Sequence, residues 1–189
     1  NFYREWGNII NAFKNFQCIV VWVPFNEAWG QFDTPEVVKF TRELDPTRLI
    51  NPASGGNYDF SAGVKGFGDI LDVHHYPCPA MNVFERKFVN VLGEYGGIGY
   101  PIEGHTWIID RKWGYGKVKE SSEELMKQYE DYLEMLKTFV TNGCAAAVYT
   151  QTTDVEGEVN GLMTYDRKII KVDMPRISAA NKAVIEAMS

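Results

Sequence analysis

The sequence has no long apolar run and no cluster of basic residues. Its longest apolar stretches, at 19–25 and 144–149, are only as long as buried strands, so no membrane-spanning helix is predicted. The 19 lysines and arginines are scattered among 25 aspartates and glutamates, giving a formal net charge of −6. This balance disfavours a nucleic-acid partner. With 45% hydrophobic residues, the composition still predicts a folded core.

Cysteine is scarce, and an initiator methionine and signal peptide are missing. Cys18, Cys78 and Cys144 are odd in number and form no CxxC pair, so neither a disulfide framework nor a zinc site is indicated. Buried small side chains are the expected role of all three. We interpret the chain as a piece of a longer protein, expected to be a periplasmic or secreted bacterial protein, although the residues do not encode a compartment.

Hydrophobic periodicity predicts strands alternating with helices. Helices are expected at 2–16, 35–44, 81–88, 121–142 and 175–188, and strands at 19–25, 48–51, 70–75, 89–94 and 144–151. Residues 98–119 show no clean period and predict a long loop, and a polar loop is expected at 153–161. Alternation of this kind implies an α/β fold with a parallel sheet. Because a complete (β/α)8 barrel needs roughly 250 residues, five strand units predict a partial TIM barrel.

Polar residues gather where the predicted strands end, which is where a barrel of this kind carries its chemistry. They are Asn26, Glu27, His74, His75, Tyr76, Glu94, Tyr95, Tyr149, Thr150 and Gln151. Glu27 directly follows an apolar strand, so partial desolvation is expected to suit it to general-acid chemistry. Tyr76 is the candidate donor that keeps Glu94 ionised. Two carboxyl groups in opposite environments suit glycoside cleavage, and a separation of ~5 to 5.5 Å would predict retention of configuration.

Other side chains could contact a sugar. Asn26 is placed to reach the sugar 2-hydroxyl. Flat apolar faces are offered by Trp22, Trp29, Trp107 and Trp113, although the last two could equally be loop packing.

Four segments together carry a resemblance to a known family. VVWVPFNEAWGQ, DVHHYP, VLGEYGG and AAAVYTQTTDVEGEVNGLMTYDRK resemble the barrel domain of glycoside hydrolase family 2, which includes β-galactosidases, β-glucuronidases and β-mannosidases. The resemblance spans nearly the whole of 1–189 and implies that the chain holds barrel strands four to eight, without the first three strands or the preceding β-sandwich domains. It implies that Glu27 is the acid/base, Glu94 the nucleophile, and Tyr76 a contact of the nucleophile. It also implies that the loop after the last strand closes one wall of the sugar site.

The expected activity is that of a retaining exo-acting β-glycosidase, with β-galactosidase as the single best prediction and a carbohydrate as substrate. Asn26, Trp29, His75, Tyr76, Tyr149 and Gln151 are the expected substrate-binding residues. No cofactor is predicted. A metal site of His74, His75 and a glutamate is conceivable but is not predicted, because nothing sets its ligand spacing.

Several alternatives stay open. The chain could be a carbohydrate-binding or scaffold fragment without turnover, or part of an endo-acting barrel glycosidase. Glu27 and Glu94 could be structural ion-pair partners, and one of His74 and His75 is expected to be a core histidine because the pair alternates across a strand. Unpaired strand edges at 19–23 and 145–149 predict self-association, and the isolated chain is expected to have little activity.

Overall fold

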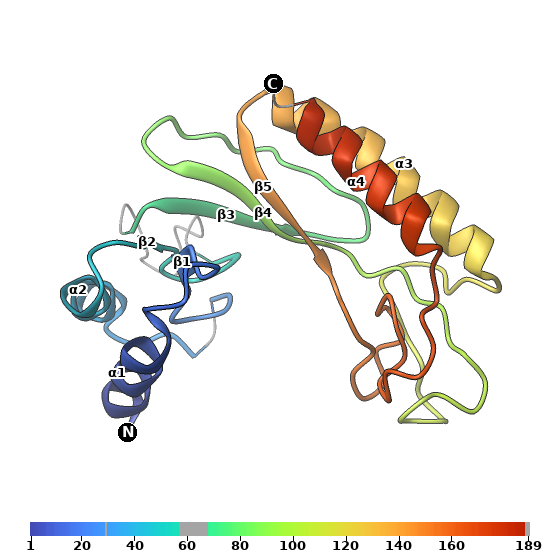
Figure 1. The fold of residues 1–189 in the computed structure, drawn as a ribbon, viewed down its shortest axis with the longest axis horizontal. Coiled ribbons are helices and arrows are strands. Elements are labelled where there is room, and N and C mark those ends of the chain that lie inside the picture. The colour runs from blue at the N-terminus through green and yellow to red at the C-terminus, as the bar shows by residue number, and fades with distance from the viewer. Residues whose placement is uncertain (29, 57–67, 188–189) are drawn as a thin grey trace. The chain divides into compact units, whose positions relative to one another are not determined.

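The computed structural model describes residues 1–28, 30–56 and 68–187. Its elements are α1 (Phe2–Phe13), β1 (Val21–Trp22), α2 (Thr34–Leu44), β2 (Leu49–Ile50), β3 (Ile70–His75), β4 (Val89–Gly96), α3 (Ser122–Thr141), β5 (Cys144–Thr150) and α4 (Met174–Glu186) (Figure 1). The strands form a parallel pair β1-β2 and a three-stranded sheet in the order β3-β4-β5. The fold is therefore mixed α/β with parallel strands, as the alternating pattern predicted.

The chain divides into two compact units. The first comprises Asn1–His74 and Val83–Gly93, and the second comprises His75–Asn82 and Glu94–Ser189. None of the helices in the described residues is long and apolar enough to cross a membrane.

In the first unit, helices α1 and α2 pack together beside the β1-β2 pair. The indole nitrogen of Trp6 on α1 donates to the Thr41 hydroxyl of α2 at 2.8 Å. Strand β1 is much shorter than predicted, because within 19–25 only Val21 and Trp22 pair with β2, although an isolated parallel bridge joins Asn26 to Ser54 further on. Trp22 is 5% exposed and donates to Asp45, so its prediction as an open sugar platform is wrong.

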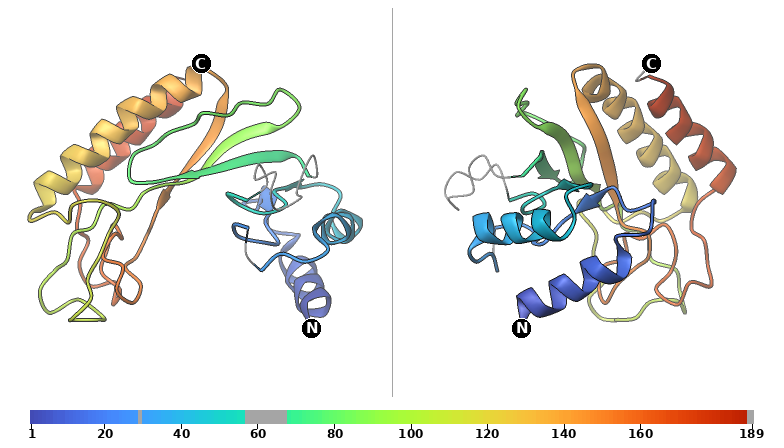
Figure 2. Two further views of the ribbon diagram at one scale, coloured as in Figure 1. Left: turned by 180° about the vertical axis from the view of Figure 1, so that it is seen from behind. Right: turned by 60° about the vertical axis from the view of Figure 1, so that its left-hand side comes forward.

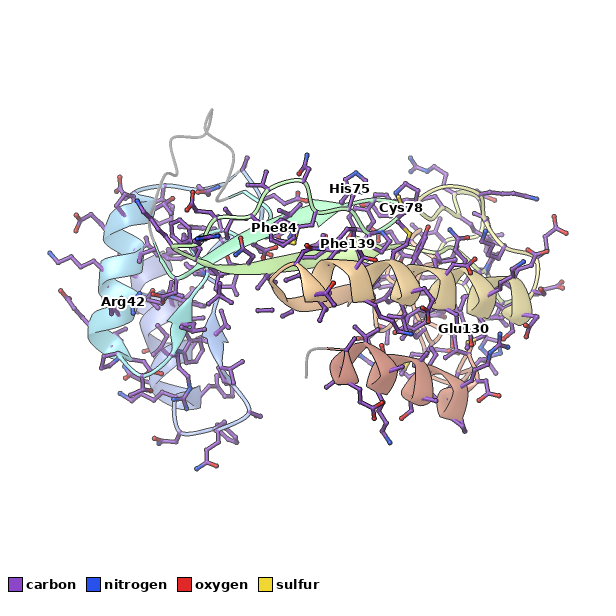
Figure 3. The ribbon with its side chains drawn as sticks, turned by 90° about the horizontal axis from the view of Figure 1, so that it is seen from above. Arg42, His75, Cys78, Phe84, Glu130 and Phe139 are labelled. Atoms are coloured by element: carbon purple, nitrogen blue, oxygen red, sulfur yellow. The ribbon has the colours of Figure 1, made fainter. Side chains whose placement is uncertain are left out.

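The helix predicted at 81–88 does not form. Asn90, at the start of β4, explains its absence: its side chain accepts from the Glu85 amide at 2.8 Å and donates to the Glu85 and Phe88 carbonyls. An asparagine that satisfies backbone groups in this way favours a turn over a helix. In the same unit, Arg42 of α2, labelled in Figure 3, forms an ion pair with Asp69 in which the two atoms are 2.8 Å apart.

In the second unit, α3 and α4 lie side by side (Figure 2). Ser121 caps α3 by accepting from the Glu124 amide at 3.2 Å, as the Ser-x-x-Glu pattern predicted. Glu130 of α3, labelled in Figure 3, accepts hydrogen bonds from both Nε and Nη2 of Arg176 on α4, so the two residues form a bidentate ion pair. Leu125, Met126 and Leu136 bury the inner face of α3.

The cysteines differ in burial. All three are free, and Cys144 is buried while Cys78 is half-buried. Cys18 is exposed, so the prediction that it packs in the core is wrong. It follows α1 in an irregular connection.

Candidate active site

Glu27 lies directly after the bridge between Asn26 and Ser54, in the first unit. Its amide donates to the Ser54 carbonyl at 2.6 Å, and Gln31 donates to its carbonyl at 2.6 Å. The backbone of Glu27 is left-handed, with φ 57°. Such a conformation is costly for a residue other than glycine and is commonest at functional sites, where the surroundings hold it in place. The Glu27 side chain is 44% exposed, so it stands at the surface of its unit.

A buried histidine faces Glu27. His74, at the end of β3, places Nδ1 3.3 Å from Oε1 of Glu27, and its side chain is only 7% exposed. On the other side of the ring, Nε2 lies 2.8 Å from the Ser54 hydroxyl. Gly55 makes room for the ring, because a Cβ there would lie 2.4 Å from ring atoms of His74. His74 is therefore a fixed partner of Glu27.

Behind Ser54 lies a buried carboxyl group, that of Asp72. Asp72 accepts from Ser54 Oγ at 2.7 Å, from Asn51 Nδ2 at 2.6 Å and from the Gly93 amide at 2.8 Å. Burial raises the pKa of Asp72 from its usual range, and the donors from Ser54, Asn51 and Gly93 oppose that rise. A Cβ at Gly93 would lie 2.1 Å from Oδ1 of Asp72, so this strand glycine is required by the close approach of the carboxyl group.

Glu94 lies in the second unit, on β4. Tyr76 donates its phenolic hydroxyl to Oε2 of Glu94 at 2.6 Å, which is the contact that the sequence predicted. Burial, together with the neighbouring Glu94 carboxylate, raises the pKa of Tyr76 far above its ordinary value, so the phenol stays protonated and can donate. A hydrogen bond of this kind favours the ionised form of the carboxyl group that receives it.

The loop 98–119 supports Tyr76. Tyr115 stacks on the Tyr76 ring with centroids 3.8 Å apart and planes 13° apart. Tyr115 itself contacts Gly97, where a Cβ would lie 2.3 Å from its ring, and Trp113 meets it edge-on at 5.4 Å. Trp113 thus belongs to the packing that holds Tyr115, whereas Trp107 is 58% exposed and packs against Tyr165.

The remaining predicted residues have different surroundings. His75 is exposed and its Nδ1 lies 2.7 Å from the Cys78 carbonyl, with both residues labelled in Figure 3. Tyr149 packs edge-on against Tyr95 and Tyr129, and its hydroxyl accepts from the Ile98 amide at 3.3 Å. Asn26 is exposed. Trp29 lies outside the described residues.

Gln151, directly after β5, belongs to a polar cluster in the last loop. It donates to Asn160 Oδ1 at 2.7 Å and to Glu158 Oε2 at 3.1 Å, and Asn160 donates to the same Glu158 oxygen. The loop is anchored by a buried ion pair between Lys171 and Asp154, with the two atoms 2.6 Å apart. Glu158 and Asp154 are thus engaged in hydrogen bonds and an ion pair within the loop.

Sequence reasoning placed His74 among the polar residues at strand ends without giving it a role, and it missed Ser54 and Asp72. The only local signals were Gly93 inside a strand and the carboxylate two residues before His74. The sequence pointed to the two glutamates and Tyr76, and each glutamate has a partner in the structure, His74 for Glu27 and Tyr76 for Glu94. The predicted separation of ~5 to 5.5 Å between the Glu27 and Glu94 carboxyl groups stays a prediction.

Comparisons with known proteins address the family. A family model described as glycosyl hydrolases family 2, TIM barrel domain, matches residues 4–170. An FMN-binding β-glucuronidase from Facaelibacterium prausnitzii L2-6 is similar in structure, with a TM-score of 0.60, 22% identity and 90% of this chain covered. A calcium-binding mutant of Bacteroides uniformis β-glucuronidase 2 gives a TM-score of 0.61 at 17% identity over 88% of this chain.

This chain spans only 30% and 23% of the length of those two structures. No curated protein matches it significantly. At these identities the two structures support the fold, and the family model, which covers most of the sequence, identifies the family. The chain belongs to glycosyl hydrolase family 2, within its TIM barrel domain.

Proposed function

We propose that this chain supplies both catalytic carboxyl groups of a retaining, exo-acting β-glycosidase, with Glu27 as acid/base and Glu94 as nucleophile. Membership of a glycosidase family supports the reaction class. The observation that carries the assignment is the contrast between the two glutamates: Glu94 receives a 2.6 Å hydrogen bond from a phenol, whereas Glu27 faces an imidazole nitrogen. Environments that differ in this way assign one carboxylate as nucleophile and one carboxyl group as acid.

The proposed reaction has two steps and needs no cofactor. In the first, Glu94 attacks the anomeric carbon while Glu27 gives its proton to the departing glycosidic oxygen. In the second, Glu27 takes a proton from water, the resulting hydroxide attacks the anomeric carbon, and Glu94 leaves as a carboxylate. Tyr76 holds Glu94 by its hydroxyl in the free protein and can donate to the returning carboxylate.

We further propose that the strands of this chain are strands four to eight of the barrel. The chain covers less than a third of each solved relative. We therefore assign the activity to the parent protein and expect weak turnover from the 189 residues alone, because groups that position the substrate contribute much of a glycosidase's rate.

The sugar is a separate question. The solved relatives are β-glucuronidases by title, and neither comparison supports the β-galactosidase prediction. The parent protein should be assayed on 2,4-dinitrophenyl β-galactoside, β-glucuronide, β-mannoside and β-glucoside. Chain-length analysis of products from an oligosaccharide then separates exo-action from endo-action.

Covalent trapping tests the residue assignment. A 2-deoxy-2-fluoro glycosyl fluoride of the accepted sugar should label the protein once, and peptide mapping should place the label on Glu94. The variant Glu94→Gln should not be labelled. Glu27→Gln should still be labelled, because a fluoride leaving group needs no acid, and it should lose activity on a poor leaving group. Binding of the sugar without any labelling would favour the scaffold alternative and overturn the proposal.

A further inference from the structure

Four polar side chains form a continuous hydrogen-bonded network inside the first unit. Glu27 Oε1 faces His74 Nδ1 at 3.3 Å, His74 Nε2 faces Ser54 Oγ at 2.8 Å, and Ser54 Oγ faces Asp72 Oδ2 at 2.7 Å. Asp72 is 1% exposed and His74 nearly as buried. Glu27 at the open end is the one member with substantial exposure. This hydrogen-bonded network therefore leads from a surface carboxyl group to a buried one.

The donors around Asp72 set the direction of these hydrogen bonds. The Gly93 amide and the Asn51 side-chain nitrogen can only donate, so each must meet an accepting oxygen of Asp72. Ser54 uses its single proton to donate to Oδ2 of Asp72. The Ser54 oxygen can then only accept from His74, which places the imidazole proton on Nε2.

The other ring nitrogen, Nδ1, is then directed at Glu27. With Nε2 donating to Ser54, the contact between Nδ1 and Glu27 Oε1 needs one proton: either the carboxyl group donates it to a neutral ring, or a charged ring donates it to the carboxylate. In both forms a single proton lies between His74 and Glu27. A general acid must hold such a proton when the reaction begins.

We propose that His74 is a positioning residue that shares one proton with Glu27, with its tautomer fixed by Ser54 and Asp72. This inference rests on the proposed acid/base role of Glu27. The pair holds one proton before the first step and gives it to the leaving oxygen. It regains one from the attacking water in the second step, so no other proton donor is required. Glu27 lies on one side of the His74 ring, and Asp72, 3.9 Å from Nε2, lies on the other.

The close packing around His74 and Asp72 supports this positioning role. Glycine at position 55 is needed beside the His74 ring, and glycine at position 93 is needed beside the Asp72 carboxyl group. The left-handed backbone of Glu27 is held by a hydrogen bond that its amide donates to the carbonyl of Ser54. Ser54 is also the residue whose hydroxyl links His74 to Asp72. One residue therefore positions both the acid and its histidine.

Kinetics test the proposed role. His74→Phe keeps a ring and removes both nitrogens, and Ser54→Ala removes the group that fixes the tautomer. In the parent protein, each is expected to lower kcat on a poor leaving group by about tenfold to a hundredfold, at or below the 10²–10⁴ that general acid catalysis contributes. KM on the poor leaving group should change little. On a dinitrophenyl leaving group kcat/KM, which reports only the first step, should be nearly unchanged because that group leaves without an acid. His105→Phe is the matched control, since His105 also pairs with a carboxylate, Asp166, but in the second unit.

Nitrogen-15 NMR of the histidine rings tests the tautomer in the 189-residue chain without needing turnover. His74, assigned by its loss in His74→Phe, is expected to carry a proton on Nε2 at neutral pH, and its Nδ1 shift should change in Glu27→Gln. A ring protonated on Nδ1 alone, or an Nδ1 shift unaffected by Glu27→Gln, would overturn the inference. If the parent shows no glycosidase activity but the NMR result holds, the proposed function fails while the shared proton stands. Equal losses of kcat/KM on good and poor leaving groups would show that His74 is only a structural residue and would overturn the proposal.

Discussion

Lys171→Met should strongly destabilise the second unit, because it removes one partner of a buried ion pair. The Lys171 side chain is 0% exposed, and its ammonium group lies 2.6 Å from Asp154 Oδ1 and 3.1 Å from the Val159 carbonyl. Without it, Asp154 Oδ1 keeps only the Gly161 amide at 2.8 Å, and Oδ2 already has no hydrogen-bond partner among the described residues. Breaking a buried pair from one side costs about 3–5 kcal/mol.

The loss is measurable by urea unfolding followed by far-UV circular dichroism. With an m-value of ~2 kcal/mol/M, a loss of about 4 kcal/mol moves the unfolding midpoint by roughly 2 M. The double variant Lys171→Met with Asp154→Leu is the control: it replaces the pair by apolar side chains and should recover most of the loss. A single variant within about 1 kcal/mol of the wild type, or a double variant that recovers nothing, would refute the reasoning.

Three further outcomes are expected. Hydrogen bonding by Thr164 lowers the pKa of Asp166, so the ionised Asp166 stabilises the fold above the unfolded pKa near 3.9, and this stabilisation is lost as the pH falls below it. The urea midpoints of wild type and Asp166→Asn should therefore converge as the pH falls below about 4. A gap between the midpoints that widens there would contradict this. Gly93→Ala should destabilise the chain by about 1–3 kcal/mol, because the new Cβ would meet the Asp72 carboxyl group, whereas an unchanged midpoint would show that the strand yields. Strand β5 ends the sheet order and exposes Val148, so we propose that the chain self-associates and that Val148→Lys reduces it; sedimentation of the wild type as a stable monomer would be the contrary result.

Features encoded by neighbouring residues could be predicted from the sequence. The pattern Ser121-x-x-Glu124 and the apolar periodicity that follows it gave α3 nearly to its ends. The sequence also placed Glu27 and Glu94 at the ends of apolar segments and paired Tyr76 with Glu94 correctly. In each case the signal lies within one element or at its boundary.

Features that depend on contacts between distant segments could not be predicted. Alternation along β3 showed that one of His74 and His75 is buried, but only the pairing of Ser54 with Asn26 decides that His74 faces Glu27. The missing helix at 81–88 has the same origin, because Asn90 captures the backbone groups of a segment whose own propensity allows either state. The apolar run at 19–25 predicted a long strand, but a strand exists only where a partner pairs with it.

The distance between the Glu27 and Glu94 carboxyl groups tests the central claim most directly. It can be measured in a crystal structure of the parent protein. A separation of ~5 to 5.5 Å over one sugar-sized hollow is the expected result for direct attack and retention. A separation of ~6.5 to 9.5 Å would indicate an inverting enzyme, and carboxyl groups that point away from each other would contradict the account altogether.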